Sequence, residues 1–273
     1  MSDKKILTIV YHDIFDFPLT TSELEKWKAD DKLAIPAGRQ KIENKSGFYF
    51  LKGREELIGE RLEKEKIAKK KMKIARRSAR ILGLIPSIRL VGVTGALAMA
   101  NTEERSDIDL MLVTSADTLW LTRLISYALL SLTGFKIRRP GGINEKDKLC
   151  LNMWLDEDSL TWPVKERSLY SAHELGQLVP LVTKNNLYEY LMWENGWLKD
   201  YWPNIKIVNS AKRIARSKNK ILKFFNQLAF WVQKRYMTGK ITREVVTESK
   251  AIFHPVDWNH KIQLALQKRG IMM

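Results

Sequence analysis

The spacing of apolar residues changes several times along the chain, and each change predicts a different element. Between residues 54 and 85, apolar side chains recur mostly every three or four positions, which predicts one long helix with an apolar stripe. Residues 88–93 are mostly apolar and read as a buried strand. The elements expected next are a turn at Thr94 and Gly95, a short helix at 96–100, a polar loop at 101–106 and a second strand at 107–113.

In residues 1–53 the pattern predicts two helices followed by a hairpin that turns at Gly47. This order looks like a winged helix-turn-helix. However, Pro36 and Gly38 leave little room for a recognition helix between the second helix and the hairpin. We therefore expect a degenerate unit used for packing or partner contact, rather than one that reads a DNA sequence.

Helical spacing dominates from residue 163 onward, where Pro180 and Pro203 separate the expected helices. Together these patterns predict an α+β chain. A small mixed-sheet core is flanked by the winged-helix-like unit with its long basic helix and by a C-terminal all-helical domain. The expected boundaries are 1–53 for the first unit, 54–86 for the long linking helix, 87–162 for the core and 163–273 for the helical domain.

Composition narrows the class of protein. A chain of 273 residues with 45% hydrophobic residues can bury a sizeable core. The single cysteine, Cys150, excludes an internal disulfide framework and a Cys/His zinc cluster, which fits a reducing cytoplasm. The longest apolar-rich run, residues 119–135, is short and contains Arg123, so it reads as a buried helix. We expect a cytoplasmic protein with no membrane span and no signal peptide.

The net charge of +16 is concentrated in two segments. Residues 61–80 contain ten lysines and arginines against Glu63 and Glu65, and residues 206–240 contain ten with no acidic residue. Localised positive charge attracts polyanions, so we expect nucleic acid, RNA or DNA, to bind these segments. Solvated helix faces, an acidic membrane surface and an acidic protein remain alternatives.

Residues 222–236 place aromatic side chains beside basic ones. Such a mixture suits stacking on nucleic-acid bases. It also suits ordinary helix packing, and an amphipathic helix lying on a membrane surface is a further interpretation. The sequence leaves these three uses open.

Candidate chemistry gathers around the first two strands of the core. Side chains two positions apart on a strand share a face, so Asp107 and Asp109 project together while Ile108 and Leu110 face the core. Two adjacent carboxylates repel each other unless a positive charge lies between them. Carboxylate oxygens are hard ligands, which predicts Mg²⁺ or Mn²⁺ at this position.

An apolar strand, the turn Gly95-Ala96, about ten residues and then Ser-Asp-Ile-Asp-Leu together resemble the signature of the DNA polymerase beta-like nucleotidyltransferase superfamily. The resemblance implies that Gly95, Ala96 and Ser106 contact the phosphates of an NTP. It also implies that Asp107 and Asp109 hold the metal ions. A third carboxylate, from a later strand, would help activate the attacking hydroxyl group.

The chain departs from that signature at two positions. Ala96 has no hydroxyl group to contact phosphate, and Asn152 stands where the resemblance places the third catalytic carboxylate. An amide can ligate a metal but is a poor general base. Asp156 and Asp158 follow Asn152, and we do not expect either to replace that carboxylate.

The resemblance implies a metal-dependent enzyme that moves a nucleoside monophosphate from an NTP to a hydroxyl acceptor, which the charge suggests is nucleic acid. The alternative is a catalytically impaired protein of the same fold that binds nucleic acid or protein as a regulator. A third interpretation is an antitoxin-like partner of a toxin, as some small members of the superfamily are.

Overall fold

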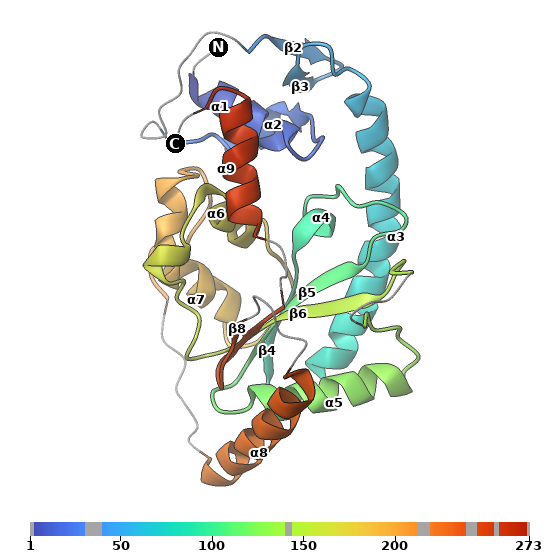
Figure 1. Ribbon diagram of the computed structural model, residues 1–273, viewed down its shortest axis with the longest axis vertical. Helices are drawn as coiled ribbons and strands as arrows, with labels where there is room; N and C mark the ends of the chain where they lie inside the picture. Colours follow the sequence, from blue (N-terminus) through green and yellow to red (C-terminus); the bar gives the residue numbers. More distant parts are fainter. Residues whose placement is uncertain are drawn as a thin grey trace.

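The computed structural model describes residues 3–30, 40–139, 144–211, 219–238, 245–253 and 257–271. Its centre is a six-stranded sheet with the strand order β7-β4-β5-β6-β9-β8 (Figure 1). β5 and β6 are parallel, and every other neighbouring pair is antiparallel. The strands are β4 (Ile88–Val93), β5 (Ile108–Thr114), β6 (Leu149–Asp156), β7 (Val179–Thr183), β8 (Val245–Val246) and β9 (Lys250–Ile252).

Alternation along β5 divides the core between the two faces of this sheet. Ile108, Leu110 and Leu112 pack with the long helix α3 (Leu57–Gly83) and with α5 (Leu119–Leu132). Met111 and Val113 face the opposite way, toward the helices α1 (Asp3–Asp13) and α6 (Leu169–Gly176). Asp107 and Asp109 share the odd-numbered face with Met111 and Val113, as the alternation predicts.

The N-terminal elements lie where the sequence predicts them. Helix α2 (Thr21–Lys26) begins with a capping box, in which Thr20 and Glu23 satisfy each other's backbone N–H groups. The hairpin β2–β3 turns at Ser46 and Gly47, both with positive φ, and pairs with the short β1. Pro36 and Gly38 lie outside the described residues, so the likeness to a winged helix stays a prediction. The three strands are β1 (Leu19–Thr20), β2 (Ile42–Lys45) and β3 (Phe48–Leu51).

The expectation of an all-helical segment after residue 163 is wrong. Three strands of the central sheet, β7, β8 and β9, come from this part of the chain. Pro180 does not separate two helices, because it lies within β7 at the edge of the sheet, where a missing N–H costs little. The helical elements of this segment are η1 (Val164–Glu166), α6, α7 (Leu187–Glu194), η2 (Gly196–Asp200), α8 (Lys220–Met237) and α9 (Trp258–Lys268).

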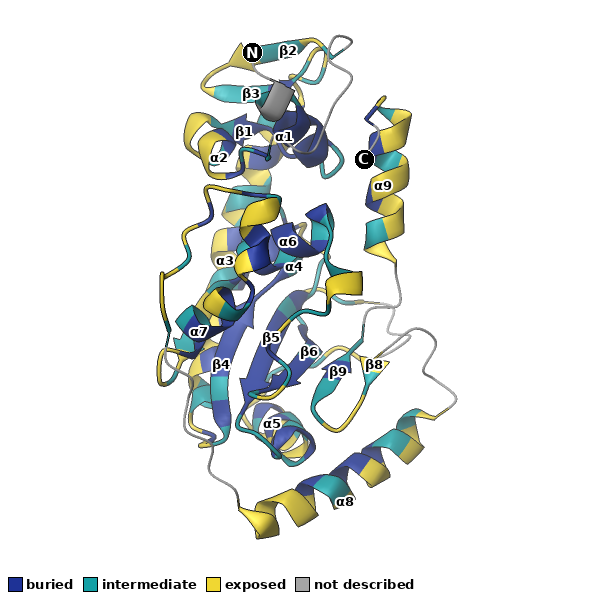
Figure 2. Cartoon of the chain, turned by 90° about the vertical axis from the view of Figure 1, so that its left-hand side faces the viewer, coloured by how far each residue is buried: buried dark blue, intermediate teal, exposed yellow. Residues whose placement is uncertain are grey.

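The hydrophobic core does not follow the expected division into four units. Leu7 and Val10 of α1 belong to the same buried cluster as Leu175 of α6 and Ile262 of α9. Figure 2 shows the buried strands of the central sheet at the middle of the molecule, with helices on either side. Arg269, which follows α9, ties the end of the described chain to α1, because its Nη2 lies 3.0 Å from Asp13 Oδ2.

The basic residues of α3 do not all face solvent, in contrast to the cationic face that the sequence predicts. Arg61 is buried and forms ion pairs with Glu23 at 2.8 Å and Glu65 at 3.0 Å. Lys71 is buried too, and its Nζ donates hydrogen bonds to Glu104 O, Ser106 O and Asp147 Oδ1. The second half of the helix still exposes a group of cations, which are Lys69, Lys70, Lys73, Arg76, Arg77 and Arg80.

Residues 135–138 contribute one isolated parallel bridge to the sheet, between Ile137 and Leu149. The basic segment 206–240 falls partly outside the described residues, at 212–218 and 239–240. Within the described ranges, no helix combines the length and the apolar character needed to cross a bilayer.

Candidate functional site

The turn after β4 lies directly against a carboxylate. Gly95 has a φ of +62°, a conformation that favours glycine. A Cβ atom at this position would lie 2.9 Å from Asp109 Oδ2. The backbone of the turn and the Asp109 side chain are therefore in close contact, and only glycine fits between them.

Asp107, Asp109 and Asn152 come together because β5 and β6 are neighbours, which is the proximity that the resemblance implied. Asn152 Nδ2 donates a hydrogen bond of 2.6 Å to Asp109 Oδ1. Asp107 Oδ2 accepts one of 2.9 Å from Arg138 Nη1. Asn152 Oδ1 is buried without a hydrogen-bond partner among the described residues, which leaves an oxygen ligand available beside two carboxylates.

The close, partly buried carboxyl groups of Asp107 and Asp109 favour a bound cation. Burial, followed by the charge of Asp107, raises the pKa of Asp109 to about 7. Oxygen ligands from Asp107, Asp109 and Asn152 suit Mg²⁺ or Mn²⁺. Cys150 Sγ lies within 4.8 Å of oxygens of both aspartates, but burial raises the pKa of this thiol, so it stays protonated and is a poor ligand for a hard ion. The residues present therefore fit a hard divalent metal.

A cavity of about 370 Å³ opens onto Asp109. Its lining includes the polar or small residues Gly95, Ala96, Asn152 and Arg138. It also includes five aromatic side chains, those of Phe15, Phe17, Tyr170, Phe253 and Trp258. This volume and this mixture of polar and aromatic lining suit a nucleotide-sized ligand.

Glu174 of α6 is a cavity residue that the sequence reasoning missed. Its carboxyl group accepts a hydrogen bond from the Gly95 backbone and another from Gln177 Nε2. Burial, and then the charge of Asp109, raises the pKa of Glu174 to about 8. The sequence shows only an acidic residue within a helical pattern, and the burial of its neighbours His173 and Leu175 is visible only in the structure.

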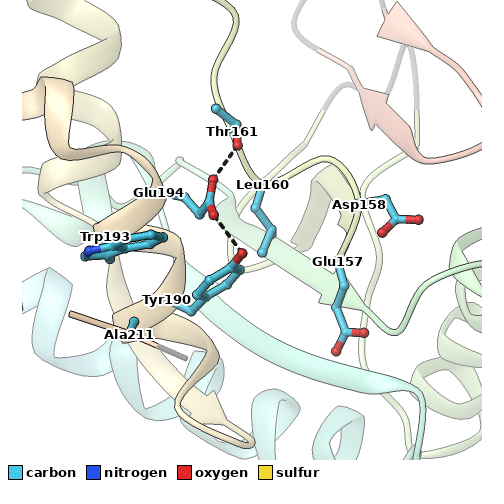
Figure 3. A pocket seen from close by; sticks show the side chains of 8 residues that line it. All are labelled: Glu157, Asp158, Leu160, Thr161, Tyr190, Trp193, Glu194 and Ala211. Atoms are coloured by element: carbon cyan, nitrogen blue, oxygen red, sulfur yellow. Dashed lines mark hydrogen bonds between the residues drawn. The ribbon is translucent and has the colours of Figure 1, made fainter. Parts of the chain in front are cut away.

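Other predicted positions lie elsewhere. Ser106 does not line the cavity, and its Oγ accepts a hydrogen bond from Glu103 N within its own loop. Asp156 ends β6 and accepts a hydrogen bond from the Asp158 backbone. Asp158 borders a second cavity, of about 380 Å³, together with Glu157 and Glu194 (Figure 3). Neither Asp156 nor Asp158 lines the cavity at Asp109, in agreement with the expectation that neither replaces the third carboxylate.

The raised pKa of Asp109 predicts that metal affinity depends on pH. Metal binding requires the deprotonated carboxylate, so a pKa of about 7 makes affinity for Mn²⁺ rise about tenfold between pH 6 and pH 8. Titration with Mn²⁺, followed by the loss of its free EPR signal, measures this change. The Asp109→Asn variant should bind weakly at both pH values, and equal affinity of the natural protein at both would contradict the prediction.

In the metal-free protein, ionisation of Asp109 lowers the stability of the fold as the pH rises, whereas it increases metal affinity. A carboxyl group whose pKa is raised by folding stabilises the fold below about pH 4, and that contribution is lost as the pH rises through about 7. We therefore expect Mg²⁺ to raise the melting temperature more at pH 8 than at pH 6.

Comparisons with known proteins find no family model and no curated protein that matches this chain. One similar solved structure is a toxin–antitoxin crystallised with AMP-PNP, at 18% identity and a TM-score of 0.23, covering 49% of this chain and 95% of that one. Another is a mutant of the toxin–antitoxin MntA–HpeT, at 17% identity and a TM-score of 0.22, with the same two coverages. Similarity at this level says nothing about activity, so the function proposed below rests on the residues of this chain.

Proposed function

We propose that this protein is a metal-dependent nucleotidyltransferase that moves a nucleoside monophosphate from an NTP to a hydroxyl acceptor. The observation that carries the proposal is the contact between the Gly95 turn and Asp109, where a Cβ atom would lie only 2.9 Å from Asp109 Oδ2. A triphosphate with its metal needs backbone donors and metal-binding carboxylates side by side. The Gly95 turn would supply the backbone donors, and β5 with the residue before it would supply the carboxylates.

Several groups in the cavity or beside it have a role in this proposal. Asp107, Asp109 and the carbonyl oxygen of Asn152 would hold Mg²⁺ or Mn²⁺, which when bound neutralises the negative charge of the triphosphate. The backbone N–H group of Ala96 would bind a phosphate oxygen, and that of Gly95 would do the same after exchanging its hydrogen bond to Glu174 for one to phosphate. Aromatic side chains of the cavity lining would contact the base and ribose.

Glu174 is the group best suited to accept the proton of the attacking hydroxyl. Asn152 cannot take this role, because an amide has almost no basicity. A carboxyl group with a pKa of about 8 is mostly protonated at pH 7, and its basic form becomes the major one as the pH rises through about 8, so transfer should increase over that range. The acceptor oxygen then forms a bond to the α-phosphorus, the bond from that phosphorus to the bridging oxygen breaks, and pyrophosphate leaves.

The exposed cations of α3 support a nucleic acid as the acceptor. Six lysines and arginines between residues 69 and 80 are exposed on this helix, which runs beside the central sheet (Figure 1). Ion pairs between such cations and the phosphates of a nucleic acid weaken steeply as the salt concentration rises.

The test is incubation of the protein with each labelled NTP, Mg²⁺ or Mn²⁺, and pools of total RNA and of DNA. The matched control is the Asp107→Asn/Asp109→Asn variant, which keeps the shape of both side chains. We expect label transfer by the natural protein and none by the variant. Absence of both transfer and metal-dependent nucleotide binding would overturn the proposal.

One observation favours a second candidate, a nucleotide-binding regulator without turnover. Asn152 donates a 2.6 Å hydrogen bond to Asp109 at the position expected for a third carboxylate. In that case calorimetry would detect Mg²⁺-dependent binding of NTP while no label is transferred. The Asn152→Asp variant would then gain transfer, whereas an enzyme that uses Glu174 would show transfer without this change.

A further inference from the structure

Helix α8 is attached to the molecule through four buried side chains, of which two, Asn226 and Gln233, are polar and two, Ala229 and Phe230, are apolar. Asn226 Oδ1 accepts hydrogen bonds from Trp120 N at 2.7 Å and Leu121 N at 3.2 Å, in the first turn of α5. Gln233 Nε2 donates to Trp120 O at 2.8 Å, and the Phe230 ring packs against the Trp120 ring. These bonds satisfy backbone groups at the start of α5, so the inner side of α8 is fixed by specific partners.

The opposite side of α8 is apolar and faces solvent. Six large side chains along it are between 49% and 68% exposed. Figure 2 shows α8 at one end of the molecule, away from the central sheet. We call this surface the outer face of α8, and its residues are Ile221, Phe224, Phe225, Leu228, Trp231 and Val232.

An apolar surface of this kind on a helix marks a contact site, because soluble monomers rarely expose so many large side chains together. The usual amphipathic helix turns its apolar face toward the core and its polar face toward water. In α8 the polar Asn226 and Gln233 point inward, whereas Trp231 points outward. The outer face therefore requires a partner that covers it.

The charge of α8 identifies the kind of partner. The helix contains Lys220, Lys223, Lys234 and Arg235 and no acidic residue. A second copy of this chain would bring the same positive charges together, which disfavours self-association through this face. Nucleic acid supplies negative charge and bases on which aromatic rings can stack. It does not supply an apolar environment for the aliphatic side chains of the outer face. An anionic lipid bilayer supplies both negative charge and an apolar phase.

We propose that α8 binds the surface of an anionic lipid bilayer, lying in the interface with its outer face among the acyl chains. Lys220, Lys234 and Arg235 then lie at the level of the negatively charged headgroups. None of the residues of α8 lines the cavity at Asp109, so that cavity stays available while the protein is bound. This inference is independent of the proposed function.

The test is co-sedimentation of the full chain with vesicles of phosphatidylcholine alone and of phosphatidylcholine with 30% phosphatidylglycerol (about one charged lipid in three, enough to attract basic segments). The test variant is Phe224→Ser/Trp231→Ser. The matched control is Leu84→Ser/Val164→Ser, which removes two side chains of comparable exposure, 75% and 76%, from other surfaces. Because all four side chains are exposed, the variants should fold, and circular dichroism checks this.

We expect the natural protein to sediment with the anionic vesicles and not with the neutral ones. The test variant should bind at least about tenfold more weakly, and the control variant should bind like the natural protein. Three results would overturn the proposal. They are no binding to anionic vesicles, equal binding by the test variant, and a dimer in sedimentation velocity without lipid that the test variant abolishes.

Discussion

Replacing Gly95 with alanine is expected to weaken Mg²⁺-dependent nucleotide binding by roughly 100-fold. The new Cβ atom would lie 2.9 Å from Asp109 Oδ2, so either the turn or the carboxylate must move. The φ of +62° adds backbone strain of about 1–3 kcal/mol for a residue with a side chain. Isothermal titration with Mg²⁺ and a non-hydrolysable NTP analogue measures the loss.

The Gly134→Ala variant separates the effect of backbone strain from the effect of the contact with Asp109. Gly134 follows α5 and also has a positive φ, of +80°, but a Cβ atom added there would meet no described atom within 4 Å. This variant should lose a similar amount of stability and retain nucleotide affinity. Normal binding by Gly95→Ala would show that the turn does not support the nucleotide.

Replacing Lys71 with methionine is expected to destabilise the protein by about 3 kcal/mol. The ammonium group is buried and donates at 3.1 Å to Glu104 O and at 2.8 Å to both Ser106 O and Asp147 Oδ1. Methionine fills the same space but leaves these acceptors without this donor. Urea unfolding followed by fluorescence measures the change in the free energy of unfolding.

Lys70→Met is the matched control, because Lys70 is the exposed neighbour on the same helix. Its effect should stay within about 0.5 kcal/mol. Since Lys71 holds the loop that leads into Asp107, Lys71→Met should also weaken Mn²⁺ binding under conditions where it remains folded. An equal change in the free energy of unfolding for the two substitutions would mean that the buried contacts of Lys71 contribute nothing to stability.

The elements that the sequence predicted are those encoded by local patterns. The strand, glycine turn and Asp-x-Asp strand lie where expected, because turn chemistry and alternation act over a few residues. The resemblance to the nucleotidyltransferase signature implied that Asn152 lies near Asp109, and the two side chains are hydrogen-bonded. The long helix α3 and its apolar stripe followed from spacing alone.

The elements that the sequence did not predict depend on contacts between distant segments. A strand at residues 179–183 conflicts with the local signal of Pro180, and it forms because β4 offers an edge to pair with. Lys71 looks in the sequence like one more surface cation, and only the fold brings it to the loop at Ser106. Glu174 reaches the cavity because α6 packs across the glycine turn, and no motif surrounds it in the chain.

The position of α9 has a consequence for synthesis of the protein on the ribosome. Trp258, at the start of α9, lines the same cavity as His12 of α1, and Arg269 pairs with Asp13. A nascent chain that ends before residue 258 already carries Asp107 and Asp109 but lacks Trp258 from the lining of the cavity. On the function proposed above, full nucleotide affinity is therefore expected only after α9 has emerged and docked, late in translation.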